Sequence, residues 1–197
     1  MRRLLLGVIF LFWLMPAMAR VPDAWLQNGC INSFGENWRL THDDEAEALA
    51  KELLAKANLD AIPIVCSDST NPLDLAGSYM WPYGKEKYFF IQLNGNFRLA
   101  IGKELRGVIA HEVGHYVHPI SCNALLRAGQ SEKFLICEHE VDMAGEKLAG
   151  VGAVVNMLKW TEQYSSQFTR SYGRNSEFQW NLRRRILLAE QEAKKTH

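Results

Sequence analysis

The spacing of apolar and polar positions predicts a chain of helices accompanied by two short strands. Residues 42–57 begin with polar and acidic residues that suit a helix N-terminus and then carry an apolar stripe at helical spacing, so a helix is expected there. The segment 61–68, "AIPIVCSD", and the segment 88–93, "YFFIQL", have the β-branched and aromatic composition of strands. The intervening stretch 71–87 has turn residues and aromatics without a period, so no regular element is predicted in it.

The pattern of the second half of the chain predicts four helices. The first contains "RGVIAHEVGHYVHP", residues 106–119. The next is expected from Ser131, as a possible cap, to Ala149, with Gly150 ending it, and two more fit residues 153–167 and 176–194. The sequence therefore predicts an α+β fold that is mostly helical with a small sheet.

The N-terminus has the pattern of a secretory signal. Arg2 and Arg3 precede the apolar run 4–14, and Ala17 and Ala19 supply the small residues that a signal peptidase requires. The run is shorter than the ~20 residues of a membrane-spanning helix, which makes a retained anchor the weaker interpretation. We therefore expect a signal peptide at 1–19, one domain at 20–197 without a transmembrane segment, and a periplasmic or secreted location.

Composition and charge narrow the function classes. The chain has 197 residues, of which 48% are hydrophobic, enough to bury one sizeable core. It carries 22 basic and 22 acidic residues, and loss of Arg2 and Arg3 with the signal leaves a net charge of −2. No basic patch argues for a nucleic-acid partner.

The motif "HEVGH" at residues 111–115 predicts a metal site. In a helix that rises ~1.5 Å and turns ~100° per residue, His111 and His115 lie on one face, where both imidazoles can bind one ion. Two histidines four residues apart, with a glutamate directly after the first, are typical of a zinc-binding helix.

A second helix supplies an acidic partner for this motif. The apolar stripe of Phe134, Val141, Gly145 and Leu148 passes through Glu138, which places that carboxylate at a core position. A buried, unpaired carboxylate costs several kcal/mol, so Glu138 is expected to bind a cation. Asp142, one turn further on, can accept the far N–H of a ligating imidazole and so fix its tautomer.

The pattern "IAHEVGHYV…CEHEVDMAGEKLAG" resembles the gluzincin metallopeptidases, and most closely the family of the CaaX prenyl endopeptidases and the heat-shock protease HtpX, over about residues 60–150. The resemblance implies a zincin-like domain with one Zn²⁺, with His111, His115 and Glu138 as ligands and Asp142 as the supporting acid. It also implies Glu112 as the general base. The chain departs from this family in lacking the membrane helices of the better-known members.

The resemblance, together with the export signal, implies a zinc endopeptidase of the bacterial envelope that acts on protein or peptide substrates in protein quality control. Zinc would activate a water molecule, and Glu112 would take its proton and return it to the leaving amine. The competing hypothesis is an interaction or chaperone-like protein that binds zinc on a degenerate peptidase fold without cutting. The intact Glu112 favours the enzyme. The missing late histidine near "NLRRRI", which in the family steadies the oxyanion, favours the alternative. Candidates to replace it are Tyr164, Arg170, Tyr172 and Arg174.

Four cysteines remain in the exported chain, and an even number favours two disulfides among three possible pairings. Cys122 follows the histidine helix and Cys137 directly precedes Glu138, so a bond between them would join the two segments that carry the expected zinc ligands. We therefore expect the pairs Cys122–Cys137 and Cys30–Cys66, with free, buried thiols as the alternative. No cysteine lies in a CxxC motif, which argues against a cysteine zinc site.

Overall fold

The computed structural model describes residues 40–68, 76–83, 85–118, 120–168 and 176–195. Along the chain these form β1 (Leu40–His42), α3 (Asp44–Lys56), β2 (Ile62–Asp68), β3 (Ala76–Tyr83), β4 (Glu86–Asn94), α4 (Gly95–Ala100), α5 (Leu105–Val117), α6 (Cys122–Arg127), α7 (Ser131–Ala149), α8 (Ala153–Phe168) and α9 (Ser176–Lys195). The α+β, mostly helical fold expected from the sequence is confirmed. The expected signal peptide, residues 1–19, lies outside the described residues.

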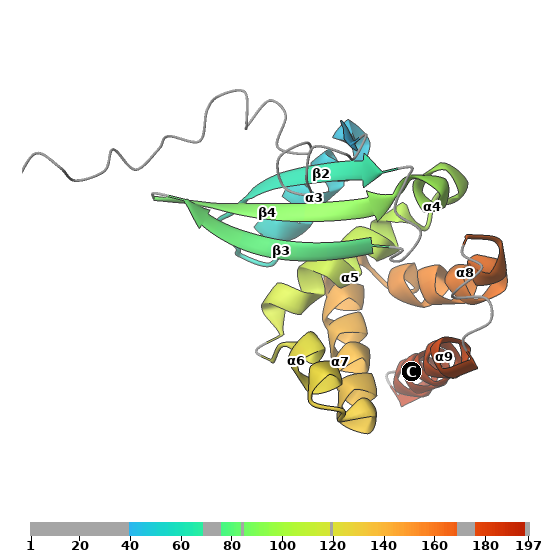
Figure 1. Cartoon of the computed structure of the whole chain (residues 1–197). Coiled ribbons are helices and arrows are strands. Elements are labelled where there is room, and N and C mark those ends of the chain that lie inside the picture. The colour runs from blue at the N-terminus through green and yellow to red at the C-terminus, as the bar shows by residue number, and fades with distance from the viewer. Residues whose placement is uncertain (1–39, 69–75, 84, 119, 169–175, 196–197) are drawn as a thin grey trace, which may run out of the picture.

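One small mixed sheet forms a layer against the helices (Figure 1). Its strand order is β1-β2-β4-β3, with β2 and β4 parallel and the two outer strands antiparallel to their neighbours. Figure 1 shows α3 and α5 against one face of the sheet and α7 extending away from it. Helix α6 lies on one side of α7, and α8 and α9 lie on the other. Because β3 is paired only with β4 among the described strands, it forms an edge of the sheet on the side where α5 runs beneath it.

The prediction that residues 71–87 hold no regular element was wrong, because residues 76–83 form β3. Its side chains alternate between the two faces, and Ala76 and Met80 pack against the core while Tyr79 stacks on Phe90 of the neighbouring strand. Small residues and Pro82 hide this alternation in the sequence. Pro is tolerated here because it lies in an edge strand.

The predicted helices agree with the structure to within about two residues at their ends. Asp43 caps α3 by accepting a hydrogen bond from the backbone N–H of Ala46 at 3.1 Å. Gly150 ends α7 with φ of 102°, a backbone conformation that favours glycine. Ser131 is the first residue of α7 and not its cap, since Gln130 takes the N-cap position. The short helices α4 and α6 and the strand β1 were not predicted.

The core lies between the sheet and the helices. Its main contributors are alternate side chains of β4 and the inner faces of α3, α5, α8 and α9: Phe89, Ile91, Leu93, Ala50, Leu53, Val108, Ile109, Val113, Leu158, Leu182 and Ile186. These contacts hold α5 by its apolar side, which fixes where its polar side points. None of the described helices is both long and apolar enough to cross a membrane.

Candidate metal centre

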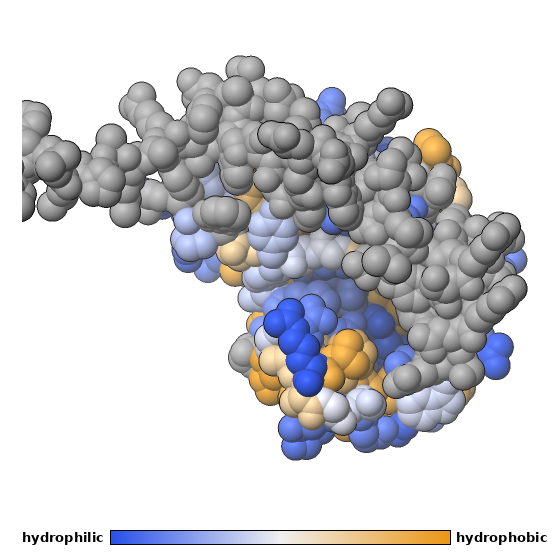
Figure 2. Space-filling model, viewed as in Figure 1, coloured by the Kyte–Doolittle hydropathy of each residue, from blue (hydrophilic) through white to orange (hydrophobic). Residues whose placement is uncertain are grey.

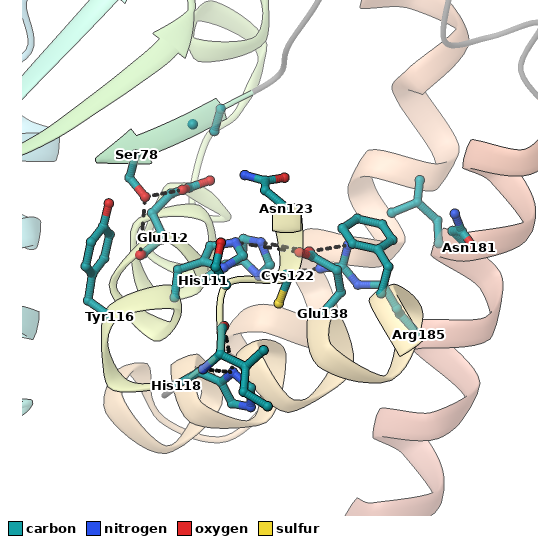
Figure 3. A pocket seen from close by; sticks show the side chains of 17 residues that line it. Ser78, His111, Glu112, Tyr116, His118, Cys122, Asn123, Glu138, Asn181 and Arg185 are labelled. Carbon is teal, nitrogen blue, oxygen red and sulfur yellow. Dashed lines mark hydrogen bonds and ion pairs between the residues drawn. The ribbon is translucent and has the colours of Figure 1, made fainter. Parts of the chain in front are cut away.

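Helix α5 carries the two histidines of the motif one turn apart. Their ring centroids are 4.8 Å apart and their planes lie at 78°, so the two imidazoles converge edge to face. The opposite side of α5, including Ile109 and Val113, is fully buried in the core. The core therefore holds the helix in the orientation that presents both imidazoles to the pocket shown in Figure 3.

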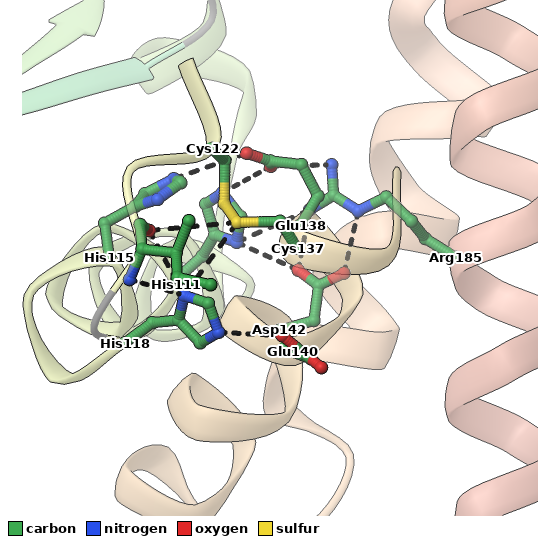
Figure 4. The surroundings of a disulfide bond; sticks show 10 residues. His111, His115, His118, Cys122, Cys137, Glu138, Glu140, Asp142 and Arg185 are labelled. Atoms are coloured by element: carbon green, nitrogen blue, oxygen red, sulfur yellow. Dashed lines mark hydrogen bonds and ion pairs between the residues drawn. A yellow bond between two sulfur atoms is a disulfide. The ribbon is translucent and has the colours of Figure 1, made fainter. Parts of the chain in front are cut away.

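Helix α7 brings the third donor. Nε2 of His111 lies 3.5 Å from Oε2 of Glu138, and Nε2 of His115 lies 3.8 Å from Oε1 of the same carboxylate. One donor atom from each of the three residues lies within 4.8 Å of the others. Figure 4 shows the two imidazoles facing the Glu138 carboxylate across the gap between the helices.

Two glycines let α5 and α7 approach closely enough for this convergence. A Cβ atom at Gly114 would lie 2.6 Å from the backbone oxygen of Val141, and one at Gly145 would lie 2.7 Å from the backbone oxygen of Ala110. Real Cβ atoms do not come this close to backbone atoms, so any side chain at either position would push the helices apart. The distance between the histidines and Glu138 thus depends on both glycines.

The donor set fits a zinc ion. Two imidazole nitrogens and one carboxylate oxygen are ligands that Zn²⁺ takes in catalytic sites, where a fourth position stays open for water. Burial, together with repulsion from His111, lowers the pKa of His115 to about 4, which keeps that imidazole neutral and its lone pair available. Glu138 is only 7% exposed, and a carboxylate at that depth is stabilised by a cation.

The histidine closer to the start of α5 is held by a buried acid. The Asp142 carboxylate, 1% exposed, lies 2.9 Å from Nδ1 of His111, so the Nδ1–H donates to it and Nε2 faces Glu138. Burial alone would raise the pKa of Asp142, but attraction and hydrogen bonds from Arg185, with a further hydrogen bond from His111, hold it well below its usual value. Asp142 is therefore a carboxylate that orients the imidazole.

Arg185 of α9 is the main participant that the sequence argument missed. Its Nε and Nη2 donate to the Asp142 carboxylate at 2.7 and 2.6 Å, and its Nη1 lies 3.4 Å from Oε2 of Glu138. The sequence contains a pattern that could have identified Arg185. Leu182, Ile186 and Ala189 form the buried stripe of α9, and Arg185 lies within that stripe, just as Glu138 lies within the stripe of α7.

The site opens into a pocket of about 580 Å³ beneath the edge strand. Figure 2 shows this face, with hydrophilic residues below the sheet and apolar residues beyond them. Residues from β3, α5, α6, α7 and α9 line it, among them Ser78, Glu112, Tyr116, Asn123, Phe134 and Asn181. Glu112 is 5% exposed, and Ser78 donates a hydrogen bond of 2.7 Å to its Oε2 (Figure 3).

A disulfide joins Cys122 at the start of α6 to Cys137 of α7, as shown in Figure 4. Nδ1 of His118 lies 3.8 Å from Sγ of Cys137, but because the two sulfurs are bonded to each other, this cluster offers no thiolate to a metal. Cys66 is also disulfide-bonded. Its expected partner, Cys30, lies outside the described residues, so that pairing stays a prediction.

Of the four candidates for an oxyanion donor, only Tyr164 lies among the described residues, and it does not line the pocket. Tyr164 packs on Trp160, with ring centroids 5.2 Å apart, and is not among the pocket residues. Arg170, Tyr172 and Arg174 lie outside the described residues.

Comparison with known proteins relates part of the chain to a peptidase family. Residues 92–181 match the family model described as peptidase family M48, a family of zinc metallopeptidases. The match runs from β4 into α9, so it includes both helices that carry the three donors, and it ends before Arg185. No curated protein and no solved structure gave a significant match to the chain. The family match indicates a peptidase.

Proposed function

We propose that the protein is a zinc-dependent endopeptidase in which His111, His115 and Glu138 hold the metal and Glu112 is the general base. The observation that carries this proposal is the convergence of the three donors, within 4.8 Å of one another, beside a buried glutamate in the same pocket. The match to peptidase family M48 over this part of the chain supports it independently.

Separate roles in hydrolysis can be assigned to individual residues of the chain. When bound, zinc would polarise the peptide carbonyl and lower the pKa of a bound water towards ~7. Glu112, one residue after the first ligand and facing the pocket, would take the proton of that water and pass it to the leaving amine. Arg185 and Asp142 hold His111 in the tautomer that leaves its Nε2 free for the metal.

Peptide and protein substrates suit the edge strand above the site. The backbone of β3 pairs with β4 on one side, and Ala76, Gly77 and Ser78 line the pocket. An extended peptide could add to this edge through backbone hydrogen bonds, which depend little on its sequence. Such a peptide would lie directly over Glu112.

We further propose that the enzyme acts in the bacterial envelope, in the periplasm or outside the cell, on unfolded or misassembled exported proteins. The signal pattern of residues 1–19 and the expected disulfides support this location. A zinc-binding protein without activity is the less favoured function, because an intact Glu112 in the pocket would then have no role.

The test is a comparison of zinc content and casein cleavage. The purified wild-type chain should bind one zinc ion and cleave casein, and a chelator should stop the cleavage. The Glu112→Gln variant should keep its zinc and lose at least ~100-fold in activity, because the carboxylate acts on water and does not hold the metal. Glu104→Gln, at the N-cap of the same helix, is the matched control and should retain wild-type activity. Wild-type cleavage by Glu112→Gln would contradict the assignment of the base.

A further inference from the structure

Ser78 is placed where the edge strand meets the proposed base. In β3 it lies opposite Ile91 of β4, on the sheet face that packs against the core. Its neighbours on this face, Ala76 and Met80, are apolar and contact the core. Ser78 is the polar member of this row, and it stands over Glu112 of α5 (Figure 3).

The hydroxyl of Ser78 has one proton to donate, and the distances show where it goes. Oγ lies 2.7 Å from Oε2 of Glu112 and 3.5 Å from the backbone oxygen of the same residue. The shorter contact has the length of a hydrogen bond to a charged acceptor, so the proton points to the carboxylate. One carboxylate oxygen is thereby engaged, and Oε1 is left for a water molecule in the pocket.

Tyr116 supports this arrangement from the next turn of α5. Tyr116 lines the same pocket as Ser78, and its ring packs edge-on against Phe89 at a centroid distance of 4.9 Å. Since Phe89 is fully buried in the core, the ring of Tyr116 is fixed in place. Ser78 is therefore held on one side by the sheet and on the other by α5.

We propose that Ser78 is a positioning residue that fixes the rotamer of Glu112 and couples its position to β3, the strand that would receive the substrate. This inference rests on the proposed function, because it needs Glu112 as the base and β3 as the docking edge. A peptide paired along β3 would restrain the strand and, through Ser78, the carboxylate. Ser78 acts on the reaction through its hydrogen bond to the Glu112 carboxylate.

The experiment uses the full chain with Ser78→Ala and Ser78→Thr, and measures kcat, KM, zinc content and unfolding for each. Ser78→Ala should lower kcat about tenfold while KM and zinc content stay within twofold of wild type. Ser78→Thr keeps the hydroxyl on a residue that suits a strand, and it should restore most of the lost kcat. This split between kcat and KM, with rescue by threonine, is not expected of a residue that only stabilises the fold.

Ser67→Ala is the matched control. Ser67 is also a strand serine that donates to a carboxylate, that of Asp43 at 3.2 Å, but it is in β2 and does not line the pocket. Its loss should lower stability slightly and leave kcat unchanged.

The inference would be overturned if Ser78→Ala had the kcat of the wild type, or if Ser78→Ala and Ser78→Thr lost kcat equally. It would also be overturned if Ser78→Ala changed only KM, or if it lost its zinc. Unfolding of both Ser78 variants would also overturn it, because Ser78 would then act on the fold and not on Glu112. An inactive wild-type chain would overturn the proposed function and this inference with it, whereas an active wild type with an unaffected Ser78→Ala would overturn this inference alone.

Discussion

Two hydrogen bonds between an imidazole and a carboxylate link the same two helical segments, yet only one belongs to the candidate metal centre. Nδ1 of His111 lies 2.9 Å from Asp142, and Nε2 of His118 lies 2.8 Å from Glu140. Asp142 is 1% exposed, whereas the side chain of Glu140 is 53% exposed. The lengths of the two hydrogen bonds are almost equal, so length alone does not distinguish a site from a surface contact.

The surroundings of the two pairs account for the difference. The free nitrogen of His111 faces the Glu138 carboxylate, and Arg185 donates two hydrogen bonds to the Asp142 carboxylate. The free nitrogen of His118 faces the backbone oxygen of Ile120 and the bonded sulfur of Cys137. In the buried pair the low local dielectric strengthens each interaction and makes an unpaired charge costly. The comparison indicates that burial and a complete set of partners define the site.

The largest effect is expected from removing the buried cation. Arg185→Met should lower the free energy of unfolding by about 3–5 kcal/mol, because Asp142 then stays buried without its main partner. The measurement is equilibrium unfolding in urea, with and without zinc.

The adjacent Arg184 is the matched control for this variant. It pairs with Glu132 through two hydrogen bonds of 2.9 and 2.6 Å and lies over the ring of Trp180, but it is exposed to solvent. Arg184→Met should cost less than about 1 kcal/mol. Equal losses in the two variants would refute the claim that burial separates the two arginine–carboxylate pairs.

An intermediate effect is expected from neutralising the buried acid. Asp142→Asn keeps the shape of the side chain but removes its charge, so His111 loses the charged acceptor that fixes its tautomer. We expect zinc affinity to fall by about 10–100-fold, as for other supporting acids of metal sites. Competition with a chromogenic chelator measures the affinity. Unchanged affinity would show that the charge of Asp142 is not needed to orient the imidazole.

The smallest effect is expected at the exposed pair. Glu140→Gln removes the charge beside His118, and it should change the free energy of unfolding by less than about 1 kcal/mol and leave zinc affinity unaltered. The same chelator competition and urea unfolding apply. A loss of zinc affinity comparable to that of Asp142→Asn would show that the two pairs are coupled through α7 and would remove the contrast between them.

The sequence correctly predicted the features that follow from helical periodicity. Helical periodicity placed Glu138 on the buried stripe of α7 and the histidines on one side of α5, and the structure agrees with both placements. It failed at β3, because Ala76, Gly77 and Ser78 have weak strand preferences and acquire their conformation by pairing with β4. Ser78 was therefore not recognised, although it contacts Glu112.

The sequence by itself determined the elements and the chemical types of the donors: two imidazoles one helical turn apart, a carboxylate within an apolar stripe, and cysteines at positions that could join their helices. Only the tertiary structure decided how these elements meet. Gly114 and Gly145 permit the close crossing of α5 and α7, and α9 delivers Arg185 to Asp142, 43 residues earlier in the chain. Spacing along one helix is set by local backbone geometry, whereas contacts between distant elements depend on how the whole core packs.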